Sequence, residues 1–145
     1  MTQPELLRFY APPVLALALL QFLVLATLGT LRLTGIARRQ SPLKYFKLLQ
    51  RPEGVEFPQH AEAAARNFIN LFEMPVLFYA LVPLIVLAGI EHGGLLTALW
   101  VFVALRYAHS AIHLTVNEVR LRFMVYAASC ATLLVAWVLF AGQVL

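Results

Sequence analysis

The fold is decided by the apolar stretch FYAPPVLALALLQFLVLATLGTL, residues 9–31, close to the start of the chain. Gln21 is its only amide side chain, and Pro12 and Pro13 stand near its beginning, where a helix tolerates proline. A membrane-spanning helix needs about 20 apolar residues, whereas the apolar core of a cleaved signal peptide is shorter. The stretch therefore predicts a retained membrane-spanning helix over residues 9–31.

Three further apolar runs follow, at about residues 60–90, 95–116 and 123–144. Of the 145 residues, 61% are hydrophobic and 12% are charged, and that charge is roughly half of what a soluble domain carries. Residues 32–59 form the long polar segment, whose prolines and glycine predict a loop. We therefore predict an all-α integral membrane protein, a four-helix bundle in a single domain of residues 1–145.

The positive charge of the chain follows membrane topology. A net charge of +4 could suggest nucleic-acid binding, but the basic residues cluster between the apolar runs, where they can contact anionic lipid. The basic residues of the first loop and its margins are Arg32, Arg38, Arg39, Lys44, Lys47, Arg51 and Arg66. Arg120 and Arg122 follow the third run, and Arg8 alone lies on the opposite side. The positive-inside rule therefore predicts cytoplasmic first and third loops and places both termini outside.

Polar side chains form two stripes within the second and third apolar runs. Arg66, Asn70 and Glu73 are spaced i, i+4 and i+7, which is one face of a helix. The second stripe follows the same rule and consists of Arg106, His109, Ser110, His113 and Asn117. Ionisable groups in membrane helices usually face a bundle interior or a water-filled cavity. Both stripes therefore indicate a buried polar layer.

The depth of these residues can be counted along the helices at about 1.5 Å per residue. The count brings Asn70, Glu73, His113 and Arg122 into one layer near the cytoplasmic face. Arg106 lies deeper and needs a partner, because an unpaired charge near the bilayer centre costs about 2.5–3.5 kcal/mol or more. We predict Glu73 as this partner, in a pair that either belongs to a site or only fixes the helix register.

The predicted layer is net positive and suits a small ligand that bears carboxylates, because arginine binds carboxylate bidentately. Arginine would also favour the thiolate form of a bound thiol. His109 and His113 have a spacing that could bind a metal, but no cysteine or second carboxylate lies near them in the sequence. Cys130, the lone cysteine, is interpreted as a small core residue.

The first stripe resembles a signature of the membrane-associated proteins in eicosanoid and glutathione metabolism, the MAPEG family. The similarity lies in Arg66-x-x-x-Asn70-x-x-Glu73, which is followed closely by Pro75 and Phe78.

The second stripe is similar to the third-helix pattern of the same family, Arg-x-x-His-[Ser/Thr]-x-x-Tyr. The matching segment is Arg106-Tyr-Ala-His109-Ser110-Ala-Ile-His113. Arg122 follows His113 by nine positions, as the arginine that holds the glutathione thiol follows the tyrosine in microsomal members. Tyr126 has a counterpart in some members.

The resemblance implies a homotrimer that binds glutathione as co-substrate between neighbouring subunits near the cytoplasmic face. It implies a transferase or peroxidase that acts on a lipophilic electrophile, with Arg122 stabilising the thiolate. The residues implied to hold glutathione are Arg66, Asn70, Glu73, Arg106, His113 and Tyr126, with Arg38 or Arg32 from the end of the first helix. The chain looks like a bacterial branch of the family, so we expect it in the inner membrane with periplasmic termini.

The chain departs from the family pattern at three positions. His113 replaces the usual tyrosine, and Ile69 stands where some prostaglandin-synthesising members have a second arginine. Pro75 follows Glu73 by two residues, where several eukaryotic members space it by four. An eicosanoid substrate is therefore not expected, and a non-catalytic scaffold or ligand-binding module is the alternative. A transporter or proton relay is the weakest reading, because residues 74–90 offer no polar path.

Overall fold

The computed structural model describes residues 1–38 and 59–145 and is helical through most of both ranges. The helices are α1 (Gln3–Ala37), α3 (Gln59–Glu73), α4 (Pro75–Leu87), α5 (Gly93–Leu114) and α6 (Val119–Val144). Within the described residues, four spans are long and apolar enough to cross a membrane, and α3 and α4 together form the second. The predicted four-helix membrane fold is confirmed.

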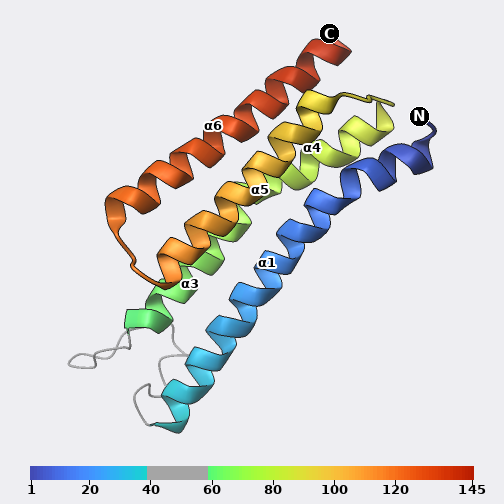
Figure 1. Cartoon of the computed structure of the whole chain (residues 1–145). Helices are drawn as coiled ribbons and strands as arrows, with labels where there is room; N and C mark the ends of the chain where they lie inside the picture. Colours follow the sequence, from blue (N-terminus) through green and yellow to red (C-terminus); the bar gives the residue numbers. More distant parts are fainter. Residues whose placement is uncertain (39–58) are drawn as a thin grey trace.

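The spans lie side by side in one bundle, with both chain termini at the same end (Figure 1). The turn between α5 and α6 and the start of α3 lie at the other end. Helix α5 packs against α1, α3 and α6, whereas α6 packs mainly on α5. Four basic residues of the predicted first loop lie outside the described residues, namely Arg39, Lys44, Lys47 and Arg51.

Helix α1 is longer than its apolar run. It begins at Gln3 rather than at residue 9, because Thr2 and Glu5 form a capping box, in which the Thr2 N–H donates to the Glu5 carboxylate at 2.6 Å. Pro12 and Pro13 consequently lie inside the helix and not in its first turn. The helix continues to Ala37, so the start of the predicted loop, residues 32–37, is helical.

The starts of α5 and α6 are also set by side chains outside the apolar runs. At α5, Nδ1 of His92 accepts the N–H of Leu95 at 3.1 Å, and the helix begins at Gly93. At α6, the Glu118 carboxylate accepts the backbone N–H groups of Arg120 and Leu121. Arg122 therefore lies in the first turn of a helix, whereas the sequence predicted a connection up to that residue.

The second span is interrupted at Met74, where the sequence predicted one helix over residues 60–90. Pro75 has no N–H to donate to the carbonyl of Leu71, four residues earlier. The side chain of Gln21 on α1 supplies the missing donor, with Nε2 lying 2.7 Å from the Leu71 oxygen. Tyr79 in turn donates its hydroxyl to Oε1 of Gln21 at 2.8 Å. Two hydrogen bonds thus hold the second span against α1 on either side of the interruption.

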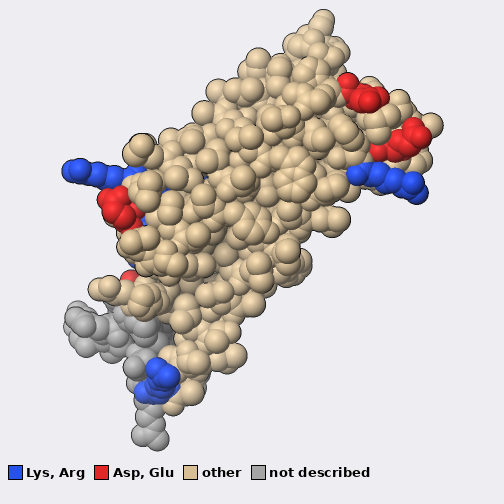
Figure 2. Space-filling view, viewed as in Figure 1, with Lys and Arg blue, Asp and Glu red and all other residues tan. Residues whose placement is uncertain are grey.

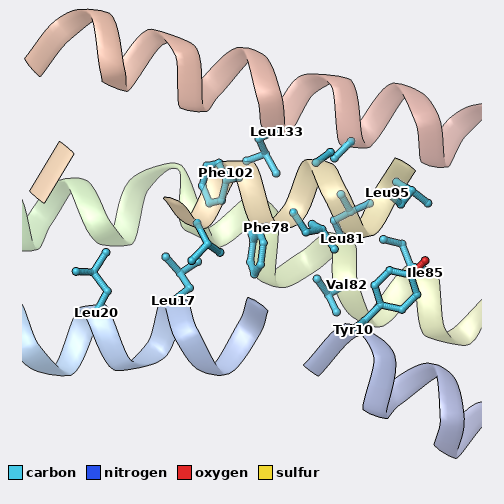
Figure 3. Close-up of a cluster of buried hydrophobic side chains, with 14 of the residues drawn as sticks. Tyr10, Leu17, Leu20, Phe78, Leu81, Val82, Ile85, Leu95, Phe102 and Leu133 are labelled. Atoms are coloured by element: carbon cyan, nitrogen blue, oxygen red, sulfur yellow. The ribbon is translucent and has the colours of Figure 1, made fainter. Parts of the chain in front are cut away.

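Aromatic and aliphatic side chains from all four spans fill the centre of the bundle (Figure 3). Phe78 and Phe102 stack with ring centroids 5.3 Å apart, and Leu17 and Leu133 lie in the same buried cluster. In lipid this packing stabilises by close contact rather than by removal from water. Figure 2 shows charged side chains only towards the two ends of the visible face, with a broad uncharged band between them. Such a band fits the hydrocarbon core of a membrane.

Candidate functional site

A cavity of about 230 Å³ opens between α3, α5 and α6, at the end of the bundle that holds the α5–α6 turn. Its lining residues are Asn70, His109, Val119, Arg122, Phe123 and Tyr126. Three of these, Asn70, Arg122 and Tyr126, are residues that the family resemblance implied for the site, and His109 belongs to the second polar stripe. Of the four residues that counting along the helices placed in one layer, Asn70 and Arg122 line this cavity, whereas Glu73 and His113 do not line it.

Arg122 is held at both its side chain and its backbone. Its Nη1 donates to Oδ1 of Asn117 at 2.6 Å. Its carbonyl oxygen lies 3.2 Å from Nδ1 of His109, and because a carbonyl only accepts, Nδ1 must carry the proton. The other ring nitrogen of His109, Nε2, is buried and has no partner among the described residues.

Arg106 is fully buried beneath the cavity, at 0% exposure. Its Nη2 donates to the backbone carbonyl of Asn70 at 2.8 Å, and its guanidinium lies over the Tyr126 ring, 5.4 Å from the centroid. The predicted partner was Glu73, but no carboxylate of the described residues lies within 4 Å of Arg106. The predicted ion pair is therefore absent from the described residues, and a backbone carbonyl takes the place of the carboxylate.

Several buried nitrogens around the cavity have no hydrogen-bond partner among the described protein atoms. Buried polar groups in proteins are almost always hydrogen-bonded, so such a cluster indicates a place for a polar ligand or water. The unpartnered atoms are Nδ2 of Asn67, Nε and Nη1 of Arg106, Nε2 of His109 and Nδ1 of His113. Nδ2 of Asn67 and the two Arg106 nitrogens are donors, which the carboxylate oxygens of a ligand would match, whereas Nε2 of His109 accepts, because the proton of this ring is on Nδ1.

The model of the MAPEG family matches residues 10–142 of the chain. The chain belongs to the MAPEG family. Neither a curated protein nor a solved structure matches it. Membership makes it a membrane protein of the glutathione and eicosanoid metabolism type, a family whose proteins are generally associated with glutathione.

The residues that the MAPEG resemblance implied are not all gathered in one place in this chain. Arg66 and Glu73 are exposed on α3, and Arg38 is exposed at the end of α1. Arg32 is exposed as well, about 1.7 turns before Arg38 by helical spacing. His113 is 1% exposed and lies behind the cavity, with its ring 5.6 Å from that of His109. The chain thus forms the cavity by itself, and the arginines of α1 and the charges of α3 named above lie outside it.

The structure adds site residues that the sequence left out of the candidate set. His109 lines the cavity. The sequence feature that could have identified it is its place in the second polar stripe, between Arg106 and His113. Asn67 is fully buried, and its Oδ1 accepts the Ser110 hydroxyl at 3.2 Å, which fixes α3 against α5. Asn67 lies three residues before Asn70, so helical spacing could have included it in the first stripe.

Proposed function

We propose that this MAPEG protein is a glutathione-dependent transferase or peroxidase that acts on lipophilic electrophiles, with Arg122 stabilising the glutathione thiolate. The observation that carries the proposal is the polar cavity in which Asn70, Arg122 and Tyr126 meet.

The charge of the cavity suits the tripeptide. No carboxylate of the described residues lies within 4 Å of either Arg106 or Arg122, so neither guanidinium forms an ion pair within this part of the chain. Glutathione has two carboxylates and a thiol, and arginine binds both carboxylate and thiolate well. A guanidinium beside the sulfur lowers the pKa of the thiol, and the thiolate is the nucleophile.

The chemistry then needs little more than that nucleophile. In a transferase step the sulfur forms a bond to an electrophilic carbon, while the electron pair of the broken bond leaves with the departing group. In a peroxidase reaction two glutathione molecules reduce a lipid hydroperoxide to the alcohol and water, and they end as the disulfide. Both second substrates are lipophilic and would reach the cavity from the bilayer.

The exposed charges on α3 support assembly into a homotrimer. Glu73 is exposed at the break in the second span, between the exposed apolar side chains of Phe72 and Val76. A charge facing lipid costs about 2.5–3.5 kcal/mol or more, so a neighbouring subunit is a better environment. We therefore propose that Arg66 and Glu73, with Arg38 or Arg32, complete the glutathione site between subunits.

The same proposal places the protein in a bacterial inner membrane, with the cavity facing the cytoplasm and both termini in the periplasm. The support is the excess of arginine and lysine in the first and third connections of the sequence, which the positive-inside rule assigns to the cytoplasm, and the cavity lies at the end that holds the third connection. Cytoplasmic glutathione would then reach the cavity directly.

The proposal is tested by titrating the purified protein in detergent with glutathione, following heat and ultraviolet thiolate absorbance. Wild type should bind saturably with a thiolate signal. Arg122→Ala should lose that signal, and Arg66→Ala should weaken the affinity. Arg120→Ala is the matched control, because this neighbouring arginine is exposed and does not line the cavity. No binding by a folded, oligomeric wild type would refute the proposal.

A non-catalytic scaffold or ligand-binding module of the same fold is the second candidate. It is favoured by His113, which stands where the family has tyrosine, and which is buried and does not line the cavity. This reading expects no affinity for glutathione. It also expects Arg66→Ala or Glu73→Ala to break the oligomer.

A further inference from the structure

The turn between α5 and α6 contains the one non-glycine residue with positive φ among those described. This residue is Asn117, whose φ of 50° lies in the left-handed region, which asparagine enters more readily than most residues. Its N–H donates to the carbonyl of Ile112 at 2.7 Å, which closes the end of α5. The conformation of Asn117 is therefore tied to the helix end, and its side chain projects from a fixed backbone.

Asn117 and Glu118, adjacent in this turn, have different polar partners. The Glu118 carboxylate caps α6, and the N–H groups of Leu121 and Arg120 hold its pKa below the usual range. The neutral amide of Asn117 instead accepts from Nη1 of Arg122 at 2.6 Å. The arginine that faces the cavity is thus fastened by an uncharged acceptor, while the nearest carboxylate in the sequence is occupied by backbone N–H groups.

We propose that Asn117 is a positioning residue that fixes the Arg122 guanidinium towards the bound thiol without neutralising its charge. This inference rests on the proposed function, in which Arg122 stabilises a glutathione thiolate. A carboxylate at position 117 would also hold the guanidinium, but its negative charge would compete with the thiolate. An amide oxygen supplies the geometry alone, since it has no net charge.

The charged and titratable groups around Arg122 come from every neighbouring element. They are Glu118 in the turn, Arg106, His109 and His113 on α5, Arg120 and Tyr126 on α6, and Arg66 and Glu73 on α3. All of them stay the same when residue 117 is changed. A difference between variants at this one position therefore reports the contact with Arg122.

The test measures the pH at which glutathione, bound at saturation, becomes thiolate in the full-length protein in detergent. Asn117→Asp keeps the left-handed backbone and the acceptor but adds a charge, and it should raise the midpoint by about one pH unit or more. Asn117→Gly keeps the backbone and removes the acceptor, so it should raise the midpoint by a smaller amount. In both variants the dissociation constant for glutathione should change by a smaller factor than the ionisation constant of the bound thiol.

Val116→Asp is the matched control, because Val116 is 73% exposed in the same turn and adds the same charge without this contact. A wild-type midpoint in Asn117→Gly would overturn the positioning role, whatever the aspartate variant does. So would a shift in Val116→Asp as large as that in Asn117→Asp. If the aspartate variant does not fold, the glycine variant decides alone. A wild type that binds glutathione without any thiolate would instead refute the role of Arg122, and a wild type that does not bind it would refute the proposed function.

Discussion

Gln21 is the only amide in the apolar stretch that defines the first span, and its side chain bonds to the second span at two points. Its Nε2 donates to the Leu71 carbonyl at 2.7 Å, and its Oε1 accepts from Tyr79 at 2.8 Å. Because Pro75 cannot donate to that carbonyl, Gln21 replaces a helix hydrogen bond that the chain itself cannot form. A residue that looked like an exception to the apolar pattern is explained by the proline in another span.

Gln21→Leu should lower the free energy of unfolding by about 1–3 kcal/mol, because it leaves the buried Leu71 carbonyl without a donor. Restoring an N–H with Pro75→Ala should make the leucine substitution much less costly. Denaturant unfolding of the single and double variants in detergent measures both effects. Gln143→Leu, at an exposed position in α6, is the control. Equal losses in the two backgrounds would show that Gln21 does not substitute for the proline's missing donor.

The pattern of side chains in the sequence predicted which residues line the cavity better than it predicted the hydrogen-bond partners of the buried side chains. Asn70 and Arg122 both line the cavity, and their depth can be counted along the helices from the sequence, whereas Tyr126 was expected from the family resemblance alone. The partner of Arg106 could not be predicted in this way, because it is a backbone carbonyl, which every residue has. The bond between Asn117 and Arg122 likewise depends on a backbone angle that the sequence does not display.

At the scale of elements, the apolar runs predicted the four spans but not their ends. Helices α1 and α6 both begin before their apolar runs, since capping side chains satisfy the first backbone N–H groups. These caps are made by polar residues, which a hydropathy profile assigns to the loops. The start of α6 matters most, because it moves Arg122 from a connection into a helix, with a fixed direction towards the cavity.

The cap of α6 makes a prediction about pH. Folding lowers the pKa of the Glu118 carboxyl from its ordinary value of 4.5, so the folded state binds fewer protons than the unfolded state as this group titrates. The contribution of Glu118 to stability is therefore present above pH 4.5 and is lost as the pH falls through the lower, folded-state pKa. Wild type should be more stable than Glu118→Ala near neutral pH, and the difference should shrink in acid. Thermal unfolding at a series of pH values measures it, and a difference that is independent of pH would contradict the capping role.

At the scale of the whole molecule, the sequence predicted that the two termini share one side, and Figure 1 places them at one end of the bundle. Which end faces the cytoplasm is a prediction from the arginine and lysine count. With Cys130 changed to alanine, a cysteine at Val116 in the α5–α6 turn should react with an impermeant reagent only after cells are permeabilised. A cysteine at Thr2 should react in spheroplasts that are still intact. The reverse pattern would invert the topology.

The proposed homotrimer can be tested by measuring the mass of the complex in detergent. Native mass spectrometry of the detergent-solubilised protein should give a complex of about three times the 16.2 kDa chain, because the exposed charges of α3 need neighbouring subunits. Glu73→Leu should retain the trimer but weaken glutathione binding if Glu73 holds the ligand. A wild-type monomer that binds glutathione would contradict a site shared between subunits. The single chain could not predict a subunit number, since periodicity describes one helix face and not how many copies meet there.

The central claim is that Arg122 stabilises the thiolate of bound glutathione, and the ultraviolet thiolate absorbance of the saturated protein tests it most directly. At neutral pH the wild type should show one thiolate for each occupied site. Arg122→Ala should bind glutathione as the thiol, and Arg120→Ala should behave as wild type. An undiminished thiolate signal in Arg122→Ala would contradict the account, because the positive cavity would then activate glutathione without the arginine that we place at its centre.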